Sequence, residues 1–529
     1  MTDTMEMSAQ SRNDTDAVDA SIESALHPSI HLSRRRNLIV PPLLRLPTEL
    51  ILKIFAHVIE TDDDYRPCHH HAQSLFVLTA ICYQLREIGT ASPQLWDCVE
   101  LTILPIAELF LERCKYNPRF LLVDESGPRW SPRSVLDPRR AAVWEKLGGR
   151  TFNHLRSLVF EGTEREFVLR VISILQRAPN LSNLDLSNIP FHPCQELPWP
   201  IGDPIPNLST LRFHNFFIGW PSPLLRNLTR LTLSCEPPRF PPERVLVETF
   251  LTALANCPDL EMLNLTHTGP EPLNDHQDQC DVVVQLRKLR KLSLEFHDPS
   301  MVGYILSHIG YPESTRLAVY VPGGVDTDLS ETISRVLPHR NVQAIQHFRK
   351  STALTVYLDD YPQFLTNNLL INFQGPHFSL QRNLQGLARF ASKIVEAVGG
   401  DTIISLDIVA RGKGPPDGMW EVLLHGLPRL ERICYRYEWG GRDQDLVNAF
   451  VLVFSRPFEG GPVCPLLQHL ELPREVLAQD SSATVLKHAL TERDTCGRRL
   501  KRIGISEEVT KVGDRLVLKQ FRDLVDEVG

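Results

Sequence analysis

Two short segments of the chain hold residue types that could bind a metal ion or a phosphate. Cys68-His69-His70-His71 offers a thiol and imidazoles, which are ligands that suit zinc. Four adjacent residues cannot all converge on one tetrahedral ion, and no partner pair lies at ligand spacing nearby, so a polar loop is the better interpretation. Gly412-Lys413-Gly414 resembles a phosphate loop only superficially, because no Ser or Thr follows the lysine and the next two residues are prolines without N–H donors. A turn is predicted there.

Four asparagines stand in triplets that match the glycosylation sequon, whereas no segment matches a catalytic motif. The asparagines are Asn180, Asn207, Asn227 and Asn264, each followed by leucine and then by serine or threonine. Because the N-terminal residues lack the apolar core of a secretory signal, the leucine repeat described below explains the triplets better than glycosylation does. The chain has no G-x-S-x-G elbow, H-E-x-x-H pair or kinase signature set. We therefore expect no catalytic residue, no metal site, no cofactor and no enzyme activity.

Composition restricts the class of protein. The chain has 529 residues, of which 42% are hydrophobic, so it can form a sizeable core, and its 40 prolines predict many short elements. The net charge of −8 leaves no basic excess for binding nucleic acid. The 11 cysteines are scattered without a C-x-x-C pair, which is typical of reduced thiols in the cytosol or nucleus. No apolar run approaches the ~18–20 residues of a membrane span, so we expect a soluble intracellular protein without a membrane partner.

The elements that any functional residue would need begin with a helical module near the N-terminus. Pro47 fits the first turn of a helix, and Glu49 lies in the same turn, where the helix dipole favours a negative charge. Leu50, Ile54 and Val58 then recur at the spacing of one apolar helical stripe, with Ile51 and Phe55 beside them. After a polar break at residues 60–72, a second stripe runs through residues 75–88 and ends at Gly89, and a short third helix is predicted over residues 91–96.

An internal repeat dominates the chain from residue 151 onward. The unit is Leu-x-x-Leu-x-Leu, with starts at Leu155, Leu181, Leu208, Leu228, Leu260 and Leu289, and again at Leu430, Leu467 and Leu500. Neighbouring starts in the first block lie 20 to 32 residues apart, close to the ~20–29 of leucine-rich repeats. The alternating residues predict a strand buried on one face, and amphipathic helical patterns lie between several units, for example over residues 167–175 and 246–254. The predicted fold class is an α/β leucine-rich-repeat solenoid, curved, with strands concave and helices convex, behind a small all-α module.

These patterns divide the chain into six segments. We predict a disordered tail over 1–39, whose first part is acidic and lacks aromatic residues, and the helical module over 40–100. A linker or N-terminal cap follows over 101–150, then leucine-rich repeats over 151–300. Residues 301–425 hold either degenerate repeats or an inserted domain, with strand-like pieces around residues 317, 356, 371 and 406 and a helix over 383–398. Repeats and a C-terminal cap occupy 426–529.

The helical module resembles an F-box. The resemblance rests on Leu46-Pro47-x-Glu49-Leu50 with Ile54-Phe55 at the opening, Ile81-Cys82-x-x-Leu85 in the middle, and Pro93-x-Leu95-Trp96 at the close. With the repeats, the whole chain is similar to the F-box proteins with leucine-rich repeats of the fungal F-box family. Two features depart from the family pattern: Leu85 stands where the family usually has tryptophan, and the break at residues 60–74 is longer than in a minimal F-box.

The resemblance implies a substrate receptor of an SCF (Skp–cullin–F-box) ubiquitin ligase, cytoplasmic or nuclear and monomeric within the complex. The F-box would dock on the Skp-type adaptor, and through it on a cullin, while the repeat surface would hold an unknown protein target. The adaptor-binding residues that it implies are Leu46, Pro47, Glu49, Leu50, Ile54, Phe55, Ile81, Cys82, Leu85, Pro93, Leu95 and Trp96. The alternative hypothesis is a leucine-rich-repeat scaffold or interaction protein whose F-box module does not engage the ligase; the replacement of tryptophan by Leu85 favours it.

Overall fold

A computed structural model gives the fold of 24 stretches of the chain. It describes residues 42–59, 67–124, 143, 146–147, 152–161, 174–175, 177–187, 195–196, 205–217, 219–235, 246–270, 282–296, 298–322, 334–336, 352–358, 363–366, 369–374, 384–410, 417–437, 444–456, 462–474, 477, 480–506 and 514–528. The acidic tail, the Gly412-Lys413-Gly414 segment and most of the expected helix at 167–175 lie outside these residues. The chain divides into two compact units: unit 1 is residues 1–189 with 205–208, and unit 2 is residues 190–204 with 209–529.

Unit 1 begins with the predicted helical module. Its elements are the 3-10 helix η1 (Pro42–Arg45), α2 (Thr48–Ile59), α3 (Pro67–Ile81), α4 (Tyr83–Ala91) and the 3-10 helix η2 (Pro93–Leu95). The first helix confirms the sequence prediction, with Pro47 accepting the first backbone hydrogen bonds, from Leu50 N at 3.0 Å and Ile51 N at 3.2 Å. The predicted second stripe is two helices rather than one, because Cys82 adopts an extended conformation and separates α3 from α4.

The interpretation of Cys68–His71 as a polar loop is wrong. These residues form the first turns of α3, which begins at Pro67. Proline is tolerated at a helix start, where its missing N–H has no intrahelical partner in any case. The helical register also places His71 so that its Nε2 donates a hydrogen bond to Leu95 O at 2.8 Å. This hydrogen bond to Leu95 O favours the helical conformation of the polar run.

The sequence analysis predicted that Gly89 ends a helix, and this prediction is wrong. Gly89 lies inside α4. A Cβ atom at this position would come within 2.7 Å of Thr79 Cγ2 and 3.3 Å of Phe55 Cε2. The missing side chain therefore allows α4 to pack closely against α2 and α3. Behind these helices, Trp96 donates from Nε1 to Gly89 O at 2.8 Å, which fixes the end of the module on α4.

The remaining described elements of unit 1 are strands and one helix. They are β1 (Cys98–Glu100), α5 (Leu104–Arg113), β2 (Phe120–Asp124), β3 (Ser157–Glu161) and β4 (Asn183–Ser187). The four strands pair in parallel in the order β1-β2-β3-β4, so the parallel sheet already begins at Cys98, inside the segment expected to end the module. Strands β3 and β4, predicted from Leu155 and Leu181, are confirmed. Cys98, Leu122 and Val159 form a small buried apolar cluster on three of these strands.

Unit 2 contains a longer sheet. In the order of pairing its strands are β6 (Thr210–His214), β8 (Arg230–Ser234), β9 (Met262–Thr266), β11 (Lys291–Glu295), β13 (Arg316–Pro322), β16 (Leu369–Gln374), β15 (Gln363–Thr366), β14 (Ala353–Leu358), β17 (Ser405–Ala410), β18 (Arg432–Tyr437), β19 (His469–Leu472), β20 (Leu500–Ile505) and β21 (Val525–Val528). Two short parallel pairs stand apart from it: β5 (Gln195–Glu196) with β7 (Phe216–Phe217), and β10 (Val284–Gln285) with β12 (Ile309–Gly310). Every repeat start after Leu181 leads into one of these strands, as predicted: Leu500 is the first residue of β20, and the others lie two residues before their strands.

The sheet changes direction once, within the segment whose pattern is weakest. Strand β15 pairs antiparallel with β14 on one side and with β16 on the other. All other strand pairs of this sheet among the described residues are parallel. The strand-like pieces expected there are confirmed as β13, β14, β16 and β17, whereas β15 was not predicted.

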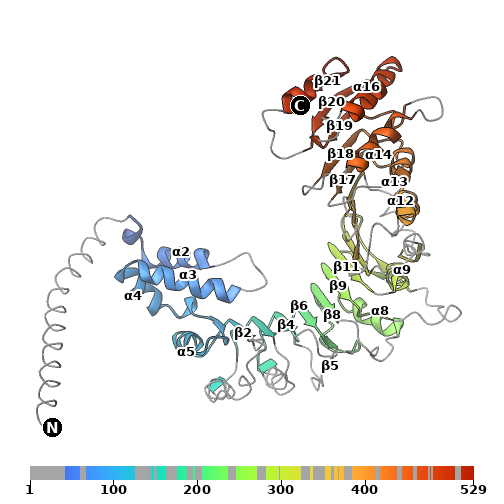
Figure 1. Ribbon diagram of the computed structural model, residues 1–529. Helices are drawn as coiled ribbons and strands as arrows, with labels where there is room; N and C mark the ends of the chain where they lie inside the picture. Colours follow the sequence, from blue (N-terminus) through green and yellow to red (C-terminus); the bar gives the residue numbers. More distant parts are fainter. Residues whose placement is uncertain are drawn as a thin grey trace, which may run out of the picture. The chain divides into compact units, whose positions relative to one another are not determined.

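The helices of unit 2 lie along one side of its strands (Figure 1). They are α8 (Val247–Ala255), α9 (Pro299–His308), α12 (Leu384–Val398), α13 (Asp417–Gly426), α14 (Gln444–Ser455), α16 (Asp480–Thr495) and α17 (Asp514–Lys519). The helix expected over 383–398 and the one expected over 246–254 are therefore confirmed as α12 and α8. The protein is a mixed α/β fold with a mostly parallel sheet. Among the described residues, no helix is both long and apolar enough to cross a bilayer.

The framework leucines of the repeat are the core of both units. The first leucine of each repeat is at most 3% exposed: Leu155, Leu181, Leu208, Leu228, Leu260, Leu289, Leu430, Leu467 and Leu500. Each such burial stabilises the fold by ~1.5–3 kcal/mol relative to an exposed side chain. After β6 the chain turns at Asn215, which is fully buried with φ 57° and donates from its backbone N to Ser234 O at 2.6 Å. Asparagine tolerates this left-handed conformation better than most residues do.

Candidate functional site

Helix α2 carries apolar residues on two neighbouring stripes, and only one stripe is buried. Ile51, Phe55 and Ile59 face the core and are at most 3% exposed. Leu50, Ile54 and Val58 occupy the adjacent stripe and are 43%, 36% and 48% exposed. Residues one position apart on a helix point ~100° apart, so burial of one set does not by itself bury the other. Among the described residues, packing therefore buries Ile51, Phe55 and Ile59 and leaves Leu50, Ile54 and Val58 more than a third exposed.

Further large apolar residues are exposed on and beside the next helices. Val77 and Ile81, one turn apart on α3, are 59% and 62% exposed, and Tyr83 at the start of α4 is 42% exposed. Leu43 of η1 is exposed as well. We call Leu43, Leu50, Ile54, Val58, Val77, Ile81 and Tyr83 the exposed apolar set. Single exposed apolar residues are ordinary on protein surfaces, but regular stripes on two consecutive helices are typical of surfaces that a partner covers.

A compact aromatic core holds the helices that carry this set. The Phe110 ring of α5 contacts Trp96 edge to face, with centroids 4.9 Å apart, and Phe76 of α3 at 5.9 Å. His71 contacts the same ring at 6.2 Å, and the guanidinium of Arg113 lies 5.9 Å from the Trp96 centroid. Edge-to-face pairs add ~0.5–1.5 kcal/mol each beyond their burial. The helical module is thus fixed on α5, the first helix of the strand-bearing part of unit 1.

The twelve residues implied by the resemblance divide by exposure. Pro47, Glu49, Leu50, Ile54 and Ile81 are exposed; Leu46, Cys82 and Pro93 are half-buried; Phe55, Leu85, Leu95 and Trp96 are buried. The buried four hold the module together and present almost no surface to a partner in this conformation. Leu50, Ile54 and Ile81 are the implied residues that combine an apolar side chain with exposure.

Sequence reasoning missed four members of the exposed apolar set, namely Leu43, Val58, Val77 and Tyr83. A signal for Val58 was present, since it follows Leu50 and Ile54 at the spacing of one helical face. Ile51, Phe55 and Ile59 form a second stripe at the same spacing, and one stripe is sufficient to bury a surface helix. Two adjacent stripes on one short helix therefore indicate that one of them has another purpose. Val77 and Tyr83 had no comparable signal, because the break between α3 and α4 was not predicted.

Two titratable groups lie near the aromatic core with shifted pKa values. Burial lowers the pKa of His71, although its hydrogen bond to the Leu95 carbonyl acts in the opposite direction. Burial raises the pKa of Asp97 to about 6, against the opposing charges of Arg119 and His154. The backbone carbonyl of Asp97 also accepts hydrogen bonds from Arg119 N at 2.9 Å and Phe120 N at 3.1 Å. Both pKa shifts have burial as their largest cause.

The chemistry available at this site is association. The exposed apolar set offers dispersion and the hydrophobic effect, and the half-buried free thiol of Cys82 lies between Ile81 and Tyr83 in the chain. Within the described stretches, no group of three or more His, Cys, Asp and Glu side chains is arranged to hold a metal ion. Cys82, Cys98, Cys114, Cys235, Cys257, Cys434, Cys464 and Cys496 are free thiols. Comparison with known proteins adds no assignment: no protein-family model matches the chain, and no curated protein matches it significantly.

Proposed function

We propose that this chain is the substrate-recognition subunit of an SCF-type ubiquitin ligase, without catalytic residues of its own. Residues 40–100 would act as the F-box and bind a Skp-type adaptor, which in turn binds a cullin. The catalysis of ubiquitin transfer would belong to those partners. The receptor would be cytoplasmic or nuclear, a location supported by the free thiols of the described cysteines, and monomeric within the complex.

The observation that carries the proposal is the exposed stripe of α2. Leu50 and Ile54 belong to the segment that resembles the opening of an F-box, and both are exposed although their neighbours Ile51 and Phe55 are buried. Docking against apolar helices of an adaptor would remove this stripe from water, at ~25 cal/mol for each Å² of apolar surface covered. Val77 and Ile81 would extend the contact onto α3.

The remainder of the chain would be a leucine-rich-repeat solenoid that holds the target. Strand-by-strand parallel pairing, buried framework leucines and helices along one side of the strands support this interpretation. The strands would line the concave face and the helices the convex face. In the segment around residues 301–425, the antiparallel strand β15 would interrupt the array between two blocks of repeats.

One observation favours the alternative, a leucine-rich-repeat scaffold whose helical module does not engage the ligase. Leu85 stands where the resembled family usually has tryptophan, and it is 1% exposed. Its side chain therefore contributes to the core and offers no surface for an adaptor. In this alternative the exposed apolar set would bind some other partner.

The test is co-purification of the tagged full chain with a Skp-type adaptor and a cullin. The informative variant replaces Leu50 and Ile54 together with alanine, since both side chains are exposed and helix propensity is retained. We expect adaptor recovery to fall about tenfold or more, because a few apolar anchors carry most of the energy of such interfaces. The matched control replaces Leu452 and Leu466, two leucines of unit 2 with similar exposure, and should leave recovery unchanged.

One result would reject the receptor hypothesis itself: a folded wild-type chain that recovers no adaptor, in which case the scaffold alternative would replace it. A different result would reject the docking surface: equal adaptor recovery by the Leu50/Ile54 variant and the Leu452/Leu466 variant would show that the stripe of α2 does not contact the adaptor.

A further inference from the structure

The strands β8, β9, β11 and β13 of unit 2 have a second face, opposite to the helices, and its side chains are mainly polar. In β8, β9 and β11 every second residue is buried and belongs to the core, while the residues between them point to the other face. In Figure 1, α8 and α9 lie on only one side of these strands. We call the residues of β8, β9, β11 and β13 that alternate with the buried ones the open face.

The first row of the open face is basic. Strand register aligns Arg230 with Met262, Met262 with Lys291, and Lys291 with Arg316. Because neighbouring strands lie ~4.8 Å apart, these four residues form a line across the sheet, which we call the basic row. It contains three cationic side chains and no acidic one.

Lys291 and Arg316 have no acidic partner among the residues that the structure describes, and both are exposed. Acidic side chains in the preceding turns are already paired: Asp259 lies 2.7 Å from Lys288, and Glu261 lies 3.9 Å from Arg290. Adjacent like charges on neighbouring strands destabilise a sheet slightly. The arrangement is therefore a cost to the fold that an anionic ligand would relieve.

The charge of the open face changes along the strands. The second row is neutral, and in it Asn264 donates from Nδ2 to Thr232 Oγ1 at 3.3 Å. The third row holds the one acidic residue of the open face on these four strands, Glu295, which accepts a hydrogen bond from Thr266 at 3.4 Å. A ligand covering the whole face would therefore need its negative charge over the strand starts only.

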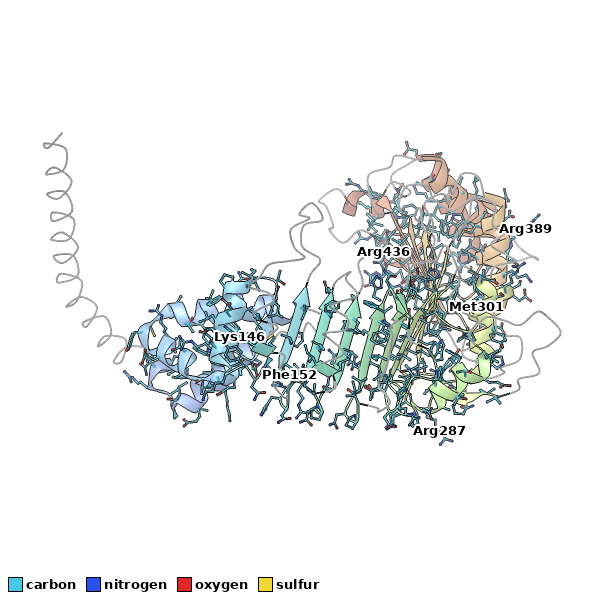
Figure 2. The ribbon with its side chains drawn as sticks, turned by 90° about the horizontal axis from the view of Figure 1, so that it is seen from below. Lys146, Phe152, Arg287, Met301, Arg389 and Arg436 are labelled. Carbon is cyan, nitrogen blue, oxygen red and sulfur yellow. The ribbon has the colours of Figure 1, made fainter. Side chains whose placement is uncertain are left out.

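A second charged region of the same sheet differs because it contains its own counter-charges. On β17, β18 and β19 the register aligns Asp407, Cys434 and Glu471 in one row. The guanidinium of Arg432 lies 3.4 Å from Glu471, and Arg436 interacts with the Cys434 thiol. Figure 2 shows Arg436 on the side of the strands away from Arg389 of α12. This cluster is close to internal charge balance, whereas Lys291 and Arg316 of the basic row have no acidic partner among the described residues.

From this contrast we infer that the basic row binds an acidic, extended segment of a protein, with Asp or Glu carboxylates against Lys291, Arg316 and Arg230. As the target-binding surface of a ligase receptor, the inference rests on the proposed function. Single positive charges spread along a line match a run of single carboxylates, whereas one phosphate group is held best by cations that converge on a point. A nucleic acid is opposed by the net charge of −8 and by Glu295.

The test measures fluorescence anisotropy of a labelled peptide of about ten alternating Glu and Ser residues, long enough in extended form to cross the four strands. The full chain is compared with a Lys291→Glu, Arg316→Glu variant. The matched control carries Arg287→Glu and Arg389→Glu, the same change of charge at exposed positions outside the basic row, which Figure 2 labels. We expect the first variant to bind about tenfold or more weakly, the control to bind within about twofold of wild type, and added salt to weaken binding.

Four outcomes would overturn the inference: no binding of the Glu-Ser peptide by the wild-type chain, equal losses in the two variants, equal binding of a Gln-Ser peptide, or preference for a phosphoserine peptide or a single-stranded RNA of similar length. Adaptor co-purification, measured on the same preparations, separates this result from the receptor hypothesis. The Lys291/Arg316 variant should keep the adaptor, and the Leu50/Ile54 variant should keep the peptide. A wild-type chain that binds the adaptor but not the peptide would reject this inference and leave the receptor hypothesis standing, and the converse result would reject the receptor hypothesis alone.

Discussion

Helix α2 and strands β8 and β9 use their apolar residues in opposite ways. In the strands, the framework leucines are buried and the exposed positions between them are mainly polar. In α2, apolar residues occur on both sides, so that Phe55 is buried while Ile54, the preceding residue, is exposed. In the strands, burial of the framework leucines accounts for the alternating apolar pattern. In α2, burial of Ile51 and Phe55 does not account for the apolar residues of the adjacent stripe, which remain exposed.

The comparison indicates two different ways to bind a partner. A repeat strand must bury one face against its helices, so recognition is left to the polar face, where charge selects the ligand. A small helical module leaves part of its apolar surface exposed, because a chain segment of this size cannot bury all of its apolar side chains. Its partner is then selected by shape and hydrophobicity. The predictions below test where this distinction holds and where it fails.

The largest expected effect separates the two stripes of α2. Phe55→Ala should destabilise the helical module by about 3–5 kcal/mol, since the side chain is fully buried and no neighbour can fill the cavity. Ile54→Ala should change stability by no more than about 0.5 kcal/mol, because its side chain is exposed. Hydrogen exchange of the α2 amides measures both effects locally and does not require the two units to unfold together. Similar exchange rates in the two variants would contradict the division of the helix into an inner and an outer stripe.

The next prediction concerns Arg493, a charged side chain that is buried in unit 2. This residue of α16 is 2% exposed and donates to the carbonyl oxygens of Val463, Cys464 and Leu467 at 2.6, 3.1 and 3.3 Å. Arg493→Met keeps most of the packing over Phe454 and removes all three hydrogen bonds. We expect a loss of about 2–4 kcal/mol, because hydrogen bonds to a charged donor contribute ~1.5–3 kcal/mol each and are not additive. Urea denaturation of unit 2 provides the measurement, with Arg498→Met, an exposed neighbour, as control.

The strands of the fold could be predicted from sequence because the repeat carries its own signal. The spacing from Leu208 to Leu211 and Phe213 places the last two of these residues on one face of β6 and repeats around Leu228, Leu260 and Leu289. A period of two and a recurring unit reinforce each other, so even the weakly patterned strands β13 and β17 were predicted. Strand β15 was not, because its antiparallel pairing depends on two neighbours and on no repeat.

The helical module was predicted less completely for a physical reason. The packing of α3 and α4 determines which apolar stripe of α2 is buried. The sequence of α2 alone does not specify where those helices pack. The conformation of His71 could not be predicted locally either, because its hydrogen-bond acceptor, Leu95 O, lies 24 residues further along the chain. The apolar spacing predicted correctly that the segment is helical. The motif resemblance grouped buried Trp96 with exposed Ile81, because a motif does not distinguish residues that form a surface from residues that support it.

A smaller effect is expected at Gly89, where close helix packing determines the shape of the module. Gly89→Ala should cost about 1–2 kcal/mol, since the overlap with Thr79 Cγ2 outweighs the gain of ~1 kcal/mol in helix propensity. Combining it with Thr79→Ser removes the Cγ2 methyl group and keeps the hydroxyl that donates to Leu75 O at 2.9 Å. Thermal unfolding should show the double variant to be more stable than Gly89→Ala alone. If the second substitution restores nothing, the proximity of α4 to α3 does not set the cost.

The smallest expected effect lies at Asp97, where the helical module meets β1. Burial raises the pKa of this carboxyl to about 6, above the ~3.9 of an unfolded chain, so the folded state binds the proton more tightly. The contribution of Asp97 to stability is therefore greatest below pH ~4 and is lost as the pH rises through about 6. Asp97→Asn removes this dependence while His71, whose lowered pKa acts in the opposite direction, titrates in both proteins. The free energy of unfolding of wild type minus that of the variant, measured with urea, should be about 1 kcal/mol larger at pH 5 than at pH 7. A difference that stays constant, or shifts the other way, would mean that the carboxyl is hydrated and that the junction between helices and strands is open to water.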